Sequence, residues 1–130
     1  MKSNVILKLD LDRWTIKNAM RMVNFRLRWI DYYFDILPAR VSFYKTNKGL
    51  HCYIDSLTET VLPNEYITHI QRDLESDWLR EVRNLKRLHD NMTSNWNLMF
   101  NSKYRIVKDK VEILSMESFI TSYVLSKKGR

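Results

Sequence analysis

Two aspartates, Asp10 and Asp12, lie one residue apart near the start of the chain, where apolar and polar side chains alternate. In a strand, residues i and i+2 point to the same face, so both carboxylates share one face. Two carboxylates placed in this way can hold Mg²⁺ or Mn²⁺, which prefers oxygen ligands and can bridge to nucleotide phosphates. The alternative is that Asp10 is a solvated strand residue and Asp12 caps the following helix.

A histidine and two tyrosines lie on the polar faces of two later alternating segments. His51 shares its face with Tyr53, and Tyr44 lies on the corresponding face of the preceding segment. An imidazole can contact a phosphate or orient a reacting group, which makes His51 the candidate catalytic residue; the alternative is a packed or solvated side chain. The two tyrosine rings offer surfaces on which bases can stack.

The charge balance favours a polyanionic partner. The 22 Lys and Arg residues against 15 Asp and Glu residues give a net charge of +7, and the sequence pI is about 9.6. Neutralised phosphates release counterions, so we predict nucleic acid as the partner, with DNA favoured over RNA; the alternative is a solvated basic surface. The candidate nucleic-acid-binding residues are Arg13, Lys17, Arg21, Arg28, Arg40, Tyr44, Lys45, Lys48 and Tyr53.

The elements that must position these residues follow from periodicity. Residues 5–11 alternate as a strand, and residues 14–37 carry apolar side chains at helical spacing up to Pro38. Residues 40–54 alternate on both sides of a turn that contains Gly49, which predicts a hairpin. Residues 63–92 are again helical, with a restart at Ser76-Asp77. After the restart, Leu79, Val82, Leu85 and Leu88 are predicted to face inward.

The last third of the chain predicts shorter elements: a strand at 96–100, a hairpin at 104–114 around Asp109 and a short helix at 116–125. The whole chain, 1–130, is then one α+β domain with the ferredoxin-like, RRM-like β-α-β-β-α-β plan. The helices should cover one face of an antiparallel sheet, with the hairpin and short helix as a C-terminal addition. In that plan the third strand lies between the first two, so Asp10 and His51 should be neighbours on the uncovered face.

Two motifs, one in each of the first and third predicted strands, resemble those of archaeo-eukaryotic primases and primase-polymerases. The run ILKLDLD is similar to their hydrophobic-Asp-hydrophobic-Asp motif, and KGLH, residues 48–51, is similar to their small-Gly-x-His signature. The resemblance covers the first half of the chain and implies metal binding by Asp10 and Asp12, phosphate contact by His51 and a role in replication. The family's third acidic ligand has no clear equivalent: Asp109 lies in a predicted turn, and Glu112 is the nearest strand carboxylate.

The chain has two further resemblances. The strand plan resembles the RNA-recognition motif, although Leu50 and His51 replace the aromatic and small residues expected after Lys48-Gly49. The compact size also resembles small orphan proteins of archaeal viruses and plasmids, which would place a viral chain in the host cytoplasm.

The first helix has too many apolar residues for one packed side. Beyond its core stripe it carries Met22, Phe25, Trp29 and Tyr33, again at helical spacing. A helix that is apolar on two faces is buried twice or meets a partner, which predicts a homodimer through these four residues. The alternative is that the C-terminal helix covers them within the monomer.

The remaining composition narrows the class of protein. Cys52 is the only cysteine, and it is predicted to face the core. An intrachain disulfide is therefore impossible, and we expect an intracellular, cytoplasmic chain with no membrane span. Three functions stay open: a nucleic-acid-associated protein resembling half of a primase-polymerase, a non-catalytic DNA- or RNA-binding regulator, and a homo-oligomeric assembly protein. The sequence does not decide whether the chain is an enzyme.

Overall fold

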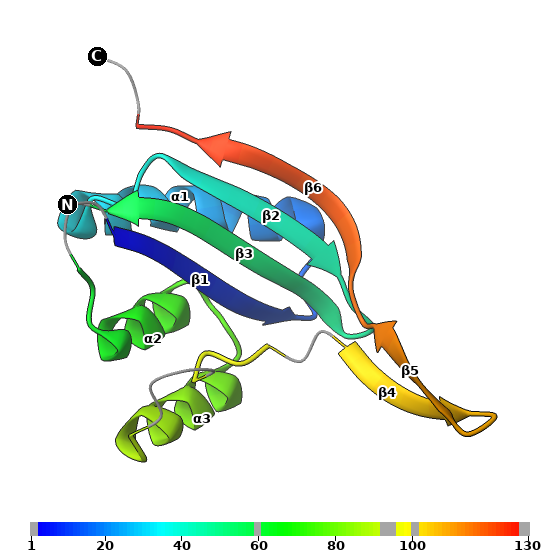
Figure 1. The fold of residues 1–130 in the computed structure, drawn as a ribbon. Coiled ribbons are helices and arrows are strands. Elements are labelled where there is room, and N and C mark those ends of the chain that lie inside the picture. Colours follow the sequence, from blue (N-terminus) through cyan, green and yellow to red (C-terminus); the bar gives the residue numbers. More distant parts are fainter. Residues whose placement is uncertain (1–2, 59–60, 92–95, 100–101, 128–130) are drawn as a thin grey trace.

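The protein is an α+β fold built on a four-stranded antiparallel sheet. The computed structural model describes residues 3–58, 61–91, 96–99 and 102–127. Figure 1 shows three helices beside the sheet and a separate two-stranded hairpin. The elements are β1 (Ser3–Asp12), α1 (Ile16–Phe34), β2 (Ala39–Lys45), β3 (Gly49–Thr58), α2 (Asn64–Asp73), α3 (Trp78–His89), β4 (Ser102–Val107), β5 (Lys110–Ser115) and β6 (Ser118–Leu125).

The strand order is β1-β3-β2-β6, so the predicted place of the third strand, between the first two, is confirmed. Asp10 is the direct cross-strand partner of His51. The fourth strand, β6, joins the sheet at the β2 edge. In a ferredoxin-like sheet the fourth strand lies beside β1. The order β-α-β-β-α is therefore kept, and the last strand of the sheet is displaced to the opposite edge.

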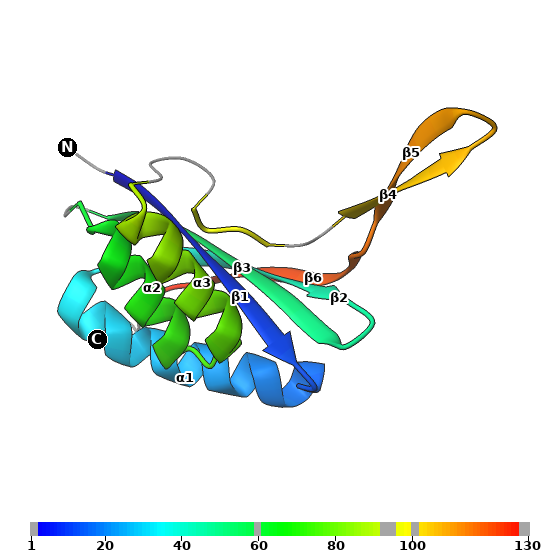
Figure 2. The ribbon, with the colours of Figure 1, turned by 90° about the horizontal axis from the view of Figure 1, so that it is seen from below.

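The C-terminal part corrects two predictions. The short helix expected at 116–125 is wrong, because this segment is strand β6; its aromatic and β-branched residues favour a strand, and β2 offers it an open edge. The strand expected at 96–100 is absent from residues 96–99, and Phe100 lies outside the described residues. The hairpin around Asp109 is confirmed as β4 and β5, and it extends away from the main sheet (Figure 2).

The outer edge of β1 is capped at Lys8 and Asp10 by Gln71, Ser76 and Asp77 instead of by a strand. The backbone N–H of Lys8 donates to Gln71 Oε1 at 2.9 Å, and that of Asp10 donates to Ser76 Oγ at 3.0 Å. The backbone N–H of Asp77 donates to the Asp10 carbonyl at 2.7 Å. These contacts satisfy the outward-facing N–H groups of Lys8 and Asp10 and the Asp10 carbonyl, and they leave no place at these residues for a fourth strand.

The helix starts are set by local capping. Asp77 caps α3 as predicted, because its Oδ2 accepts the backbone N–H of Arg80 at 3.1 Å. Asp12 as the cap of the first helix is wrong: β1 runs through Asp12, Arg13 follows in a left-handed conformation, and Thr15 is the N-cap of α1. Asp12 is therefore a strand residue and not a helix cap.

The hydrophobic core lies between α1 and the sheet. The inner side of α1 buries Ala19, Val23, Leu27 and Ile30, and Cys52 of β3 is buried against them as predicted. Helix α2 adds its own apolar residues to this core, while α3 lies beyond it along β1 (Figures 1 and 2).

Helix α3 packs with the face opposite to the one expected. The sequence predicted an apolar inner face made of Leu79, Val82, Leu85 and Leu88. Instead, Leu79 and Val82 are exposed, Leu85 and Leu88 are half-buried, and the buried residues are Arg80, Glu81 and Asn84. The reason is that a strand edge presents hydrogen-bonding groups, so a polar helix face is the one that fits it.

Candidate nucleic-acid interface

The structure brings Asp10 and His51 together on the sheet face opposite α1. His51 Nε2 lies 3.8 Å from Asp10 Oδ1. The face is not bare at this point, because His51 is only 6% exposed. The predicted juxtaposition is therefore present, but the imidazole lies beneath other side chains.

Glu117, between β5 and β6, covers the histidine. Its Oε2 lies 3.3 Å from His51 Nδ1, and Tyr53 donates its hydroxyl hydrogen to the same carboxylate at 2.8 Å. Within the described residues, His51 Nδ1 has no hydrogen bond of normal geometry. The histidine is thus set between two carboxylates, one from β1 and one that follows the hairpin.

Three rings form an aromatic cluster beside this pair: Tyr44 of β2, Tyr53 of β3 and Phe119 of β6. The Tyr44 ring lies edge-on to both of the others, with centroids 5.5 Å apart in each case. Tyr44 and Tyr53 are half-buried, whereas Phe119 is 61% exposed. Because β6 occupies the edge beside β2, it adds a third ring to the two predicted tyrosines.

The electrostatics of the pair follow from burial. Burial, followed by the negative charge of Asp12, raises the pKa of Asp10 to about 7. Burial lowers the pKa of His51, and the nearby carboxylate of Glu117 opposes part of that shift. At neutral pH the face therefore holds a neutral imidazole beside a carboxyl group that is close to its own titration point.

A small cavity opens between this pair and α3. It has a volume of about 110 Å³, and we call it the arginine pocket because three arginines line it. Arg87 Nη1 donates to Asn84 Oδ1 at 2.8 Å, whereas Arg83 is exposed and makes no hydrogen bond or ion pair within the described part of the chain. The lining residues are Asp10, His51, Asp77, Arg80, Arg83, Arg87, Leu98 and Met99.

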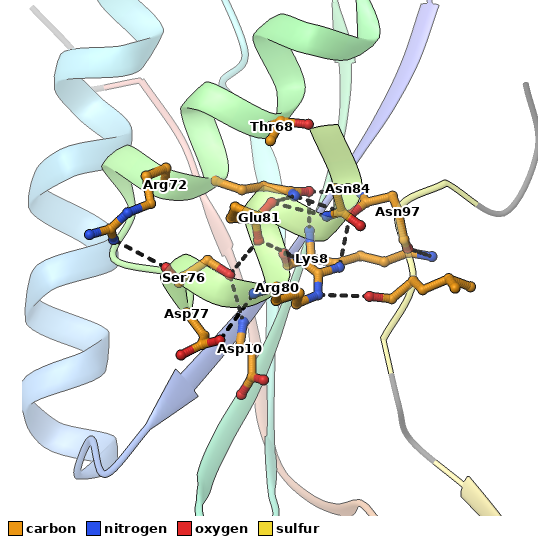
Figure 3. Close-up of polar contacts among 12 residues, drawn as sticks. Lys8, Asp10, Thr68, Arg72, Ser76, Asp77, Arg80, Glu81, Asn84 and Asn97 are labelled. Carbon is orange, nitrogen blue, oxygen red and sulfur yellow. Dashed lines mark hydrogen bonds and ion pairs between the residues drawn. The ribbon is translucent and has the colours of Figure 1, made fainter. Parts of the chain in front are cut away.

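A buried polar network holds α3 in place at this pocket (Figure 3). Glu81 is 2% exposed and accepts hydrogen bonds from Gln71 Nε2 and Ser76 Oγ, each at 2.7 Å. It also accepts from Asn84 and forms an ion pair with Arg80. The network fixes the helix relative to β1, and hence fixes the arginines relative to Asp10.

Arg80 links this network to the strand and to the segment 96–99. Its Nη1 donates to the Lys8 carbonyl at 2.9 Å, and its Nε donates to the Leu98 carbonyl at 2.7 Å. Asn97 completes the link by accepting from Arg80 Nη2 at 2.8 Å. Because its donors are already used, Arg80 is a structural residue of the pocket, and Arg83 and Arg87 are the arginines available to a ligand.

The predicted basic residues do not form one surface. Lys17, Arg21 and Arg28 lie on α1, on the other side of the sheet from the aromatic cluster, and Arg28 donates to the Ser126 carbonyl. Arg40 lies on the same face as the cluster and donates to Ser122 Oγ. Arg13, Lys45 and Lys48 are exposed near the β2–β3 turn, where the Arg13 N–H donates to the Lys48 carbonyl.

No complete metal centre is present among the described residues: no group of three or more His, Cys, Asp or Glu side chains is placed to hold an ion. Asp10 and Asp12 place two carboxylates close together on one face, and Asp109 lies at the far turn of the β4–β5 hairpin. Two carboxylates are the smaller ligand set that Mg²⁺ uses when a substrate phosphate completes its shell.

The sequence does not predict Glu117 or Phe119 at this site, and for the three pocket arginines it favours a solvated face over phosphate binding. Arg80, Arg83 and Arg87 stand at helical spacing, but Glu81 between them suggested a solvated face with little net charge. The burial of Glu81 removes that argument. A signal was therefore present in the spacing, whereas nothing local in the sequence places Glu117 beside His51.

The comparisons with known proteins give no relative. No family model matches the chain, and neither the curated proteins nor the solved structures contain a match. Across the part of the chain that the structure describes, no helix is both long enough and apolar enough to cross a membrane.

Proposed function

We propose that the protein binds single-stranded nucleic acid, with DNA favoured over RNA, on the sheet face opposite α1. The observation that carries the proposal is the aromatic cluster, in which three rings from three strands stand together on this face. Aromatic rings on an open sheet are a common platform for unpaired bases, because every base has a flat face to stack. The ring of Phe119 is the most accessible of the three.

The arginine pocket supports the same proposal. It adjoins the cluster through His51, which lines the pocket and is the cross-strand partner of Tyr44. Arg83 and Arg87 can bind a phosphate there while the neighbouring bases stack on Tyr44 and Phe119. A binding site that combines cationic groups with stacking rings is typical of proteins that bind single strands.

Replacing Phe119 with alanine tests the proposal. Loss of one stacking ring costs about 1–3 kcal/mol of binding, so we expect Phe119→Ala to weaken binding of a short labelled single-stranded DNA by about 5- to 150-fold. Fluorescence anisotropy at several salt concentrations measures this, and the wild-type affinity should fall steeply as salt rises.

Tyr66→Ala is the matched control, because this ring is also exposed but lies on α2 beside Phe34. It should leave the affinity unchanged. Equal losses in both variants, or an affinity that does not respond to salt, would contradict the proposal. A parallel titration with RNA of the same sequence decides the preference for DNA.

A cation-dependent activity resembling that of primase-polymerases is the second candidate. The raised pKa of Asp10 beside Asp12 favours it, because two crowded carboxylates gain from a divalent cation between them. Asp10 and Asp12 would hold Mg²⁺ or Mn²⁺, and the ion would supply charge stabilisation at a nucleotide phosphate. His51 would act from beneath, by orienting Asp10.

Asp10→Asn tests this second candidate and the electrostatics together. The folded chain keeps the Asp10 proton up to about pH 7, whereas the unfolded chain loses it near pH 3.8, so stability falls as the pH rises between these values. The neutral variant escapes that loss. We expect it to equal the wild type near pH 4 and to exceed it by about 1–3 kcal/mol at pH 8, a value reduced from the full shift because water reaches part of the side chain.

Urea denaturation at the two pH values gives the stability difference, and isothermal titration with MnCl₂ gives the cation affinity. Asp10→Asn should abolish heat from Mn²⁺ binding that the wild type shows. Absence of Mn²⁺ binding in the wild type removes the cation proposal and leaves nucleic-acid binding as proposed.

A further inference from the structure

The outer side of α1 carries a stripe of exposed aromatic residues that nothing in the described chain covers. We define the α1 aromatic stripe as Phe25, Trp29, Tyr32 and Tyr33, which are 65%, 60%, 80% and 73% exposed. Met22, predicted as part of the same surface, is half-buried against the core, and the segment expected to cover the stripe is strand β6, which pairs with β2. Clusters of large apolar side chains on a surface mark interaction sites.

The shape of the stripe favours a copy of itself as the occupant. Phe25 and Trp29 pack edge to face, with centroids 6.4 Å apart. Trp29 borders two hollows: one is shared with Phe25 and Tyr32, and the other with Tyr33 and Phe34. The projecting Trp29 ring of one copy can enter an aromatic-lined hollow of the other copy. Such self-complementarity is what a two-fold interface requires.

Charge gives the orientation. Lys17, Arg21, Arg28 and Asp31 follow one another at intervals of four, seven and three residues, which places them along one flank of α1, and Asp35 follows at its C-cap. The basic residues lie in its first two thirds and the acidic residues at its end. Both groups oppose the dipole of their own helix, which favours acidic groups at the start and basic groups at the end.

When α1 of a second copy packs antiparallel to the first, this order of charges becomes favourable. It sets the basic start of each α1 against the acidic end of the other, and a two-fold axis perpendicular to the helices keeps the same flanks together. Asp31 accepts the Leu37 N–H at 2.8 Å and Asp35 pairs with Lys127, so both carboxylates are already oriented at that end.

We propose that a second copy of this chain packs on the α1 aromatic stripe as an antiparallel, two-fold symmetric dimer. The axis passes near Phe25, which meets its counterpart, and Trp29 packs over the partner's Met22. This interface lies on the other side of the sheet from the aromatic cluster (Figure 2), so it is independent of the proposed nucleic-acid binding.

Light scattering coupled to size-exclusion chromatography tests the proposal on the full chain. The wild type should elute with twice the monomer mass of 15.8 kDa. Trp29→Glu should give a monomer with an unchanged circular dichroism spectrum, because the side chain is exposed, and should raise the dimer dissociation constant at least about 100-fold, since one substitution removes two central contacts. Trp78→Glu is the matched control on α3, with a tryptophan 62% exposed, and should remain dimeric.

A charge reversal tests the orientation separately. Lys17→Glu should weaken the dimer, and adding Asp35→Arg should restore it, because the two positions face each other only in the antiparallel pair. A monomeric wild type, or a dimer that Trp29→Glu leaves intact, overturns the proposed interface. A dimer that the second reversal fails to restore overturns its antiparallel arrangement.

Discussion

Glu81→Ala should destabilise the protein by about 3–5 kcal/mol, because it leaves the buried Arg80 charge without its partner. Glu81 also accepts hydrogen bonds from Gln71, Ser76 and Asn84, all of which lose an acceptor in the same change. Buried donors that lose their acceptor carry the full cost of desolvation. Urea denaturation followed by circular dichroism measures the loss.

Lys86→Ala is the control on the same helix. Lys86 pairs with Asp90 at 2.8 Å, but both side chains are exposed. A pair of this kind contributes about 0–1 kcal/mol, so the variant should unfold close to the wild type. If Glu81→Ala behaves like Lys86→Ala, the network is not what holds α3 on β1.

Gly49→Ala should destabilise the protein by about 2–3 kcal/mol, because a methyl group does not fit where the β2–β3 turn meets the end of β1. A Cβ atom there would lie 2.3 Å from the Leu11 carbonyl oxygen and 2.6 Å from the Arg13 nitrogen. Both are backbone atoms, so neither can move without shifting β1. The change should lower the thermal unfolding midpoint.

Asn47→Ala provides the comparison, because this neighbouring turn residue is exposed. It should change stability by less than about 0.5 kcal/mol. A Gly49→Ala variant as stable as Asn47→Ala would mean that the turn and the strand end separate more easily than their 2.7 Å hydrogen bond between Arg13 N and the Lys48 carbonyl indicates.

The sequence predicts the first three strands, the long helix α1 and the interruption between α2 and α3 before Asp77. Each depends on local information: alternation in β1, helical spacing in α1 and a capping carboxylate at α3. The same information placed Asp10 beside His51, because the order of the first three strands follows from the handedness of the crossover.

The edges of the sheet were not predictable in this way. Which edge the last strand joins depends on contacts between distant parts of the chain, and at the β1 edge Gln71 of α2 and Ser76 of the α2–α3 connection occupy the backbone groups that a strand would pair with. The face of α3 that packs inward depends on the same event. The wrong prediction of a helix at 116–125 has a related cause. Apolar residues three and four apart in β6 match helical spacing by coincidence, and it is pairing with β2 that makes this segment a strand.

The candidate site was half predictable for the same reason. Asp10, His51, Tyr44 and Tyr53 come from the strands whose order was predicted. Glu117 and Phe119 reach the site because β6 joins β2, and the arginine pocket exists because α3 turns its polar side inward. Nucleic-acid binding, cation binding and the homodimer all remain predictions.

Closing the β1 edge has a consequence for how molecules of this protein can associate through their backbones. Among the described strands, the outer side of β6 is the remaining unpaired edge of the four-stranded sheet. Fibril growth needs two free edges per molecule, one for each neighbour. Within the four-stranded sheet, main-chain pairing at β6 joins two molecules β6 to β6, and strand pairing at Lys8 and Asp10 of β1 requires Gln71, Ser76 and Asp77 to leave first.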